Sequence, residues 1–123
     1  MSAKKDAAVG FLTMVAAGKI DEAYERHVGP GLVHHNQHFK GDIASLKQAM
    51  KDNHAENPGK VLEVKRSLED GELVAVHSHI RQSEADGGFA VVHLFRFEGG
   101  KVVEMWDVGQ AVAADSPNEN GVF

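Results

Sequence analysis

Two histidines at strand spacing are the first candidates for chemistry in this chain. In LVAVHSHIR, residues 73–81, His77 and His79 stand two positions apart in a run with the composition of a buried strand. Side chains two apart on a strand point to the same face. The pair could bind a metal ion, exchange protons in a pocket, or satisfy nearby carboxylates and carbonyls. With His93 it would suit zinc, copper, nickel or iron, although the chain's eight histidines make this spacing common by chance.

The other face of the same strand is apolar. Val74, Val76 and Ile80 alternate with the histidines and are expected to pack against apolar groups, including those of a second subunit. On this interpretation, His77 and His79 line a covered cavity together with His93.

The last predicted hairpin determines where an aspartate points. A two-residue turn at Gly99-Gly100 would place Asp107 on the face of Val92 and Leu94. A three-residue loop with a glycine bulge would shift the parity. One face would then carry four residues: His93, Phe95, Met105 and Asp107.

The second arrangement is favoured by charge. It pairs Arg96 with Glu104 across the strands on the opposite face, where unlike charges attract. Helices that cover the face of His93 and Asp107 would remove water from the Asp107 carboxylate. Such an environment suits a general base that takes a proton from carbon next to a carbonyl. The alternative is a solvated aspartate near a strand end, or a partner for Trp106 or a backbone N–H.

A polar loop adds further candidates. Asn36 could donate its amide to a substrate carbonyl or a developing enolate oxygen, with His35 beside it. Histidine and asparagine also occupy surface loops without any role, and His34 and His38 are assigned to that interpretation. Tyr24 is expected in the core or the cavity wall, where its hydroxyl needs a partner.

The bulk composition excludes several classes. The 123 residues are 42% hydrophobic and 25% charged, which is the composition of one globular domain. A net charge of −5 without a basic stripe argues against nucleic acid. No cysteine is present, so disulfides, thiolate catalysis and cysteine-bound zinc are excluded. Glycine-rich phosphate loops, serine elbows and zinc-helix motifs are also missing.

The elements expected from periodicity are helices followed by strands. Helices are predicted over 4–17, 20–27 and from a cap at Asp42 to Pro58-Gly59, with an irregular stretch LVHHNQHFKG between the last two. Four strands follow: VLEVKRSLE, LVAVHSHIRQ, FAVVHLFRFE and KVVEMWDVGQAV. Residues 112–123 are predicted to form a C-terminal tail. The pattern predicts one α+β domain over 1–123, with helices on one face of a curved antiparallel sheet.

The N-terminus also bears on localisation. Lys4-Lys5 before AAVGFLTMVAA faintly resembles a signal peptide, but Asp6 interrupts the junction. A single helical stripe instead indicates an amphipathic helix of the fold: Ala8, Phe11, Leu12 and Val15. No run approaches the ~20 apolar residues of a membrane span, so a cytoplasmic protein without membrane contact is expected.

The order of elements and several motifs resemble one family. HHN, VAVHSHIR, FRFEGGKVVEMWDV and the closing NENGVF are similar to the SnoaL-like proteins of the nuclear transport factor two-like superfamily, which adopts a cystatin-like fold. Ketosteroid isomerase and limonene epoxide hydrolase are related members of this superfamily. FRFEGGKVVEMWDV is the most specific segment and resembles a subgroup of predicted aldol-condensation and polyketide-cyclase-like enzymes.

That resemblance implies a deep apolar pocket, a homodimer, and a strand aspartate that removes a proton without metal or organic cofactor. By motif position Asp107 matches the aspartate and His93 a pocket residue, while Asn36 is the weaker match. His77 and His79 match a histidine pair of the subgroup. Two departures leave the substrate open: Met105 replaces a common histidine, and Gln37 replaces a common proline.

Three hypotheses follow. The first is a cofactor-free lyase or isomerase of aldol or cyclase type that acts on an apolar carbonyl compound. Asp107 would be the base, and His93 and Asn36 would be oxyanion donors or proton carriers. The second is a small-molecule-binding domain without chemistry. The third is a metal protein using His77, His79 and His93. The residues expected to contact a substrate are Asn36, His35, His79, His77, Tyr24, Phe95, Met105 and Trp106.

Overall fold

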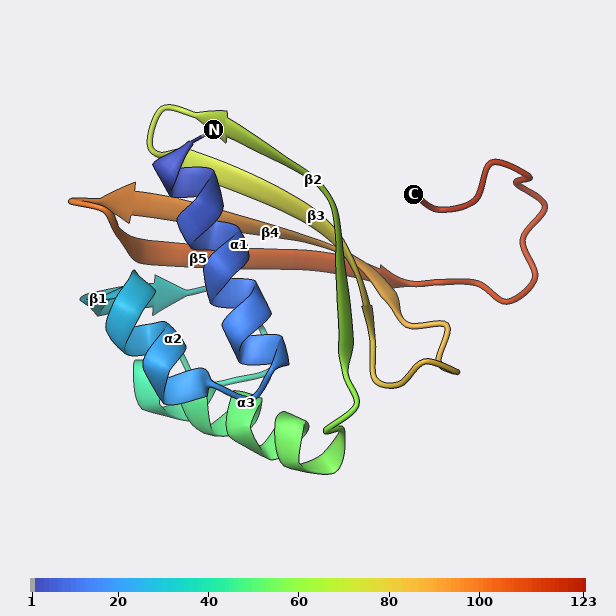
Figure 1. The fold of residues 1–123 in the computed structure, drawn as a ribbon, viewed down its shortest axis with the longest axis horizontal. Coiled ribbons are helices and arrows are strands. Elements are labelled where there is room, and N and C mark those ends of the chain that lie inside the picture. Colours follow the sequence, from blue (N-terminus) through green and yellow to red (C-terminus); the bar gives the residue numbers. More distant parts are fainter. Residues whose placement is uncertain (1) are drawn as a thin grey trace.

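The computed structural model describes residues 2–123. It contains three helices and five strands, in the order α1 (Ala3–Ala16), α2 (Ile20–His27), β1 (Val28–His34), α3 (Ile43–Glu56), β2 (Val61–Asp70), β3 (Leu73–Arg81), β4 (Phe89–Glu98) and β5 (Lys101–Ala111) (Figure 1). The helices and the four later strands were expected from the sequence, and the structure confirms the α+β class.

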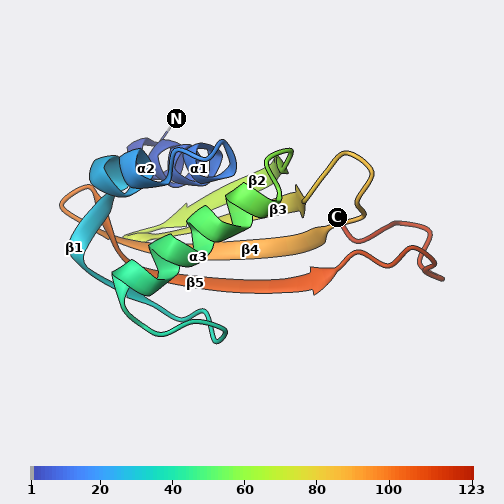
Figure 2. The ribbon, with the colours of Figure 1, turned by 90° about the horizontal axis from the view of Figure 1, so that it is seen from below.

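The strands form one curved sheet in the order β1-β5-β4-β3-β2. The four consecutive strands β2 to β5 are antiparallel neighbours, whereas β1 pairs with β5 in parallel. All three helices lie on the same side of the sheet, and the opposite side carries no helix in the described part of the chain (Figure 2). We call the helix-covered side the inner face and the opposite side the outer face.

The strand β1 is a correction to the sequence prediction, which treated much of this stretch as irregular. GPG at 29–31 looks like a break, yet the backbone pairs Val28 with Val102 and His34 with Met105. Pro30 is tolerated because β1 is the edge strand, where a missing N–H costs no central ladder bond. The pairing comes from a partner about 70 residues away along the chain, so local periodicity does not indicate it.

Two of the three helices begin at a side-chain cap, and one of these caps, Asp42, was expected from the sequence. Ser2 accepts a hydrogen bond from the Lys5 N–H at the start of α1, and Asp42 accepts one from the Ser45 N–H at the start of α3. Gly18, with φ of 84°, ends the α1 segment in the left-handed conformation that glycine adopts without strain.

The core lies between α1 and the inner face. Phe11 is 1% exposed and packs edge-on against both Phe95, at 6.0 Å, and Tyr24, at 5.4 Å. Val74 and Val76 of β3 are fully buried in the same cluster. None of the helices within residues 2–123 has the length and apolar character needed to cross a bilayer.

The hairpin between β4 and β5 combines a tight turn with a bulge. Glu98 pairs with Lys101, and both intervening glycines have positive φ, as a two-residue hairpin turn of type I′ requires. Phe97 pairs with Val102, whereas Arg96 pairs with Glu104, so Val103 is an extra residue in β5. The parity shift expected from the sequence is therefore present. Its cause is the bulge at Val103 rather than a three-residue loop.

Candidate functional site

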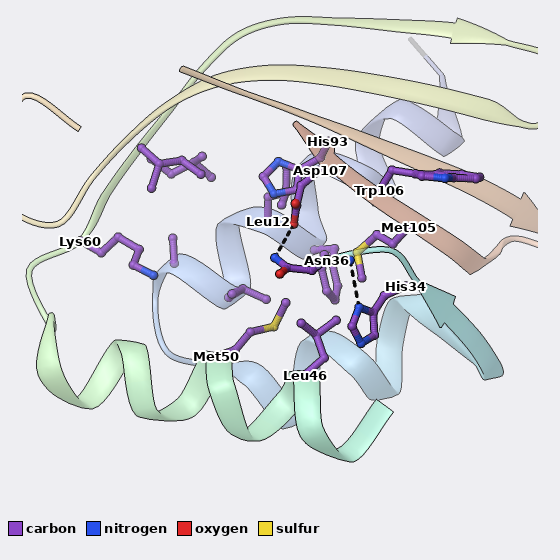
Figure 3. Close-up of a pocket in the computed structure, with 15 residues that line it drawn as sticks. Leu12, His34, Asn36, Leu46, Met50, Lys60, His93, Met105, Trp106 and Asp107 are labelled. Carbon is purple, nitrogen blue, oxygen red and sulfur yellow. Dashed lines mark hydrogen bonds between the residues drawn. The ribbon is translucent and has the colours of Figure 1, made fainter. Parts of the chain in front are cut away.

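A cavity of about 170 Å³ lies between the inner face and the helices α1 and α3 (Figure 3). Its wall is mostly apolar and draws on both helices and on strands β2, β3 and β5: Phe11, Leu12, Val15, Ala16, Leu46, Met50, Leu62, Ile80 and Met105. Polar side chains reach it at a few points: His34, Asn36, Lys60, His93 and Asp107. An apolar cavity with a few convergent polar groups is the usual form of a small-molecule site.

The carboxylate of Asp107 and the amide of Asn36 are in contact at this cavity. Asn36 Nδ2 donates to Asp107 Oδ2 at 3.0 Å (Figure 3). Asn36 Oδ1 accepts the backbone N–H of His38 at 2.9 Å. The backbone N–H of His38 occupies Asn36 Oδ1 and so fixes the orientation of the amide. The amide NH₂ group is therefore the part that faces Asp107. The pair expected from the sequence to face a substrate is therefore brought together.

His34 holds the loop that carries Asn36. It is 7% exposed, its Nδ1 accepts the Asn36 backbone N–H at 3.2 Å, and its Nε2 lies 2.8 Å from the Lys40 carbonyl oxygen. A neutral ring with its proton on Nε2 satisfies both contacts. The prediction that His34 is a surface loop residue is wrong, because β1 continues through it. Had β1 been recognised, the spacing of two between His34 and Asn36 would have placed both on one face.

His93 lies directly across from Asp107 in the ladder between β4 and β5. Its ring is partly buried, and Nδ1 is enclosed with no hydrogen-bond partner among residues 2–123. Burial lowers the pKa of His93 to about 4, against the smaller opposing effect of the Asp107 carboxylate. The imidazole is therefore neutral at neutral pH and carries one N–H donor and one acceptor.

Asp107 itself is more exposed than expected. The second half of β5 is exposed, so the helices that bury Met105 do not cover the aspartate two residues further on. The sequence prediction that helices cover this carboxylate is therefore wrong. Asp107 instead lies at the mouth of the cavity, with water on one side and the apolar wall on the other.

His35 lies outside the cavity. Its ring stacks on Trp106 at 5.1 Å with an interplanar angle of 10°, and its Nε2 lies 2.7 Å from Glu104 Oε2. Glu104 also accepts from Arg96 Nε at 3.0 Å, and the hydrogen bonds from His35 and Arg96 hold the pKa of this carboxyl below its usual value. Trp106 borders the cavity, but its ring takes part in this outer cluster.

His77 and His79 are on the outer face, which corrects the sequence prediction. His77 pairs with Val92 and therefore lies opposite to the face of His93, while Val74 and Val76 are the residues buried under the helices. The alternation was recognised, but alternation alone does not say which face is covered.

The tail residue Phe123 covers this histidine pair. Its ring centroid lies 5.6 Å from His77 and 4.7 Å from His79, and the Lys65 ammonium lies 4.9 Å from the ring centre. His79 Nε2–H donates to the Gly87 carbonyl oxygen at 2.7 Å. The rest of residues 112–123 forms neither helix nor strand.

The metal hypothesis fails in the form proposed. His93 is on the inner face and His77 and His79 are on the outer face, so the sheet itself separates the three rings. Across residues 2–123 no group of three or more histidine, aspartate or glutamate side chains is close enough to hold a metal ion.

Tyr24 and Phe95 support the wall from behind. The Tyr24 hydroxyl lies 3.3 Å from the sulfur of Met50, a wall residue, and burial raises the pKa of this phenol. Phe95 is fully buried, with its ring stacked 6.0 Å from His93. Of the aromatic and thioether candidates, Met105 and Trp106 line the cavity. The Trp106 ring is stacked on His35 outside it, whereas Met105 makes no such contact. Lys60 was not identified from the sequence, because no local pattern separates it from surface lysines.

Helices packed on the inner face of a curved sheet, over an apolar cavity, define the class as a cystatin-like or nuclear transport factor two-like α+β fold. The family model of the SnoaL-like domain matches residues 8–105, and the chain belongs to this family. No curated protein matches the chain.

Solved structures agree on the fold. IdmH from Streptomyces antibioticus, a proposed polyketide cyclase, is 17% identical with a TM-score of 0.71, covering 87% of this chain and 91% of its own. A proposed polyketide cyclase from Bacillus cereus is 20% identical with a TM-score of 0.75, covering 88% and 74%. An uncharacterised cystatin fold protein from Novosphingobium aromaticivorans is 21% identical with a TM-score of 0.69, covering 88% and 98%.

Proposed function

We propose that this protein is a cofactor-free lyase or isomerase of aldol or cyclase type, acting on a small apolar carbonyl compound. One observation carries the proposal: a carboxylate, Asp107, is held by the Asn36 amide at the mouth of an apolar cavity, directly across from a neutral imidazole, His93. Membership of the SnoaL-like family and the similarity to proposed polyketide cyclases support this class.

The proposed reaction starts at the carboxylate. Asp107 takes a proton from the carbon next to a substrate carbonyl, and the electron pair of the C–H bond moves onto the carbonyl oxygen to form an enolate. The Asn36 amide carries two N–H groups, of which one is used by Asp107, so the second can donate to this oxygen. The neutral His93 ring offers another donor on the same side of the sheet.

The second step returns the proton. In an aldol or cyclase reaction the enolate carbon attacks a second carbonyl carbon, a C–C bond forms, and the new alkoxide takes the proton from Asp107. In an isomerase the proton returns to a different carbon of the same substrate. Both routes balance without an oxidant, a metal ion or an organic cofactor.

The test is deuterium exchange without added cofactor. Acetophenone and benzoylacetone, incubated with the protein in D₂O, are expected to lose their α-protons faster than in a matched buffer blank, as followed by proton NMR. The rate should not change after dialysis against a chelator. Ala16 lines the cavity and is partly buried, so Ala16→Phe fills the cavity and should suppress the exchange. Exchange at the blank rate despite ligand binding would make this a binding domain instead.

We also propose that the chain forms a homodimer through its outer face. Four exposed apolar side chains lie on that face, one on each of β1, β2, β3 and β5: Val33, Leu68, Leu73 and Val108. Large apolar side chains exposed on one face of a sheet are a common feature of protein interfaces. Sedimentation velocity should show one species at twice the 13.3 kDa chain mass, and Val108→Glu should convert it to a monomer. A wild-type monomer at micromolar concentration would contradict this proposal.

A further inference from the structure

A lysine reaches the same cavity away from Asp107 and has no role in the reaction described above. Lys60 ends the turn between α3 and β2, where its backbone N–H donates to the Asn57 carbonyl oxygen at 3.2 Å. Its side chain lines the cavity, and Figure 3 shows it on the side of the space opposite His34. The turn therefore positions an ammonium group against an otherwise apolar part of the wall.

This ammonium group has no counter-ion in the described chain. Lys60 Nζ contacts the neutral Oδ1 of Asn53, and no carboxylate of residues 2–123 lies within ion-pair distance. By contrast, Lys47 and Lys51 share Asp21 on the surface. Burial lowers the pKa of the Lys60 amine, and no charged neighbour contributes to this shift.

A partly buried cation without a counter-ion is costly, because its lost hydration is not replaced by an opposite charge. The cost is recovered when a ligand brings the missing anion into the cavity. A carboxylate is the fitting group, since an ammonium ion and a carboxylate form a strong charge-assisted hydrogen bond.

We propose that Lys60 binds a carboxylate of the substrate, so that the substrate class is a small apolar keto acid. The inference rests on the proposed function and adds the charge and the orientation of the substrate. The carboxylate lies at Lys60, the apolar middle lies along Leu62 and Ile80, and the acidic C–H group faces Asp107. The reverse orientation would place two carboxylates together at Asp107, which is unfavourable.

The test compares two probes of the same shape and different charge, β-benzoylpropionate and its primary amide. Isothermal titration calorimetry should show that the wild-type protein binds the acid about tenfold more tightly than the amide, as one desolvated ion pair provides. Lys60→Met, which keeps an unbranched side chain of similar length, should abolish this preference and leave the affinity for the amide unchanged. Lys60→Arg should retain it.

Two controls separate an ion pair from general effects. Lys51→Met removes the same charge from the exposed side of α3 and should keep the full preference. In wild-type protein the acid should raise the pKa of the Lys60 amine, followed by NMR of the labelled side chain, and the amide should leave it unchanged. Borohydride should give no covalent adduct, because the proposed contact is ionic.

The inference is overturned if acid and amide bind equally, including the case in which neither binds at millimolar concentration. A borohydride-trapped adduct on Lys60 would also overturn it, in favour of an imine. The proposed function fails separately, because it depends on deuterium exchange of the neutral ketones. A protein that exchanges these ketones but does not distinguish acid from amide would keep the function and lose this inference.

Discussion

Asp107→Asn is expected to lower the rate of α-proton exchange by about 10²- to 10⁴-fold, the range contributed by a positioned general base. The amide has the size of the carboxylate but does not take a proton at neutral pH. Its oxygen can still accept the hydrogen bond that Asn36 Nδ2 now gives to Asp107. Ligand affinity and the melting temperature should therefore remain near the wild-type values, with the loss confined to the rate.

The matched control is Asp115→Asn, which removes the same charge from the exposed tail and should leave the exchange rate unchanged. Calorimetric titration with acetophenone measures affinity beside the NMR rate. If Asp107→Asn kept more than a tenth of the wild-type rate, the assignment of Asp107 as base would be wrong. Another group at the cavity, with His93 first, would then have to take the proton.

His93 should make the folded state sensitive to mild acid. Its pKa is about 4 in the folded protein, against the 6.5 of an unperturbed histidine, which is the value expected in the unfolded chain. Between these values the unfolded state binds the proton and the folded state does not, so the free energy of unfolding falls as the pH falls from about 6.5 to 4. The full stability is present above pH 6.5, and the loss at pH 4 is about 3 kcal/mol.

Urea denaturation at pH 7.5 and pH 4, at one protein concentration, measures this loss. His93→Gln cannot titrate and should lose about 3 kcal/mol less than wild type over the same interval. Because the acidic groups are the same in both proteins, their contribution cancels in the comparison. His38→Gln, at an exposed loop histidine, is the control and should follow the wild type. An equal loss in wild type and His93→Gln would contradict the buried neutral state of this ring.

Much of the fold was predictable because its elements carry local signals. The apolar stripe of α1 and the Asp42 cap indicate helices, and glycine turns separate the four antiparallel strands. The strand β1 was missed because its ladder partner is β5, far along the chain, and because Pro30 reads as a break. Such an edge strand depends on tertiary contacts rather than on its own propensity.

The candidate site was predictable only where alternation and charge pairing determine the geometry. The ion pair between Arg96 and Glu104 correctly indicated that His93 and Asp107 share a face. The pattern of β3 does not say which of its two faces the helices cover, and His77 and His79 were placed on the wrong one. The contacts of Lys60 depend on how the turn between α3 and β2 packs against the cavity. No periodic pattern in the sequence indicates this packing.

The extra residue Val103 has a consequence for comparing this chain with its relatives. Between the turn and Asp107, the strand β5 has one more residue than its partner β4 can pair. A relative that lacks this insertion must carry its inward-facing aspartate at a position one residue closer to the turn. An alignment that scores only residue identity would then match a buried position of one protein with an exposed position of the other. Catalytic assignments across such a gap require counting ladder pairs from the turn.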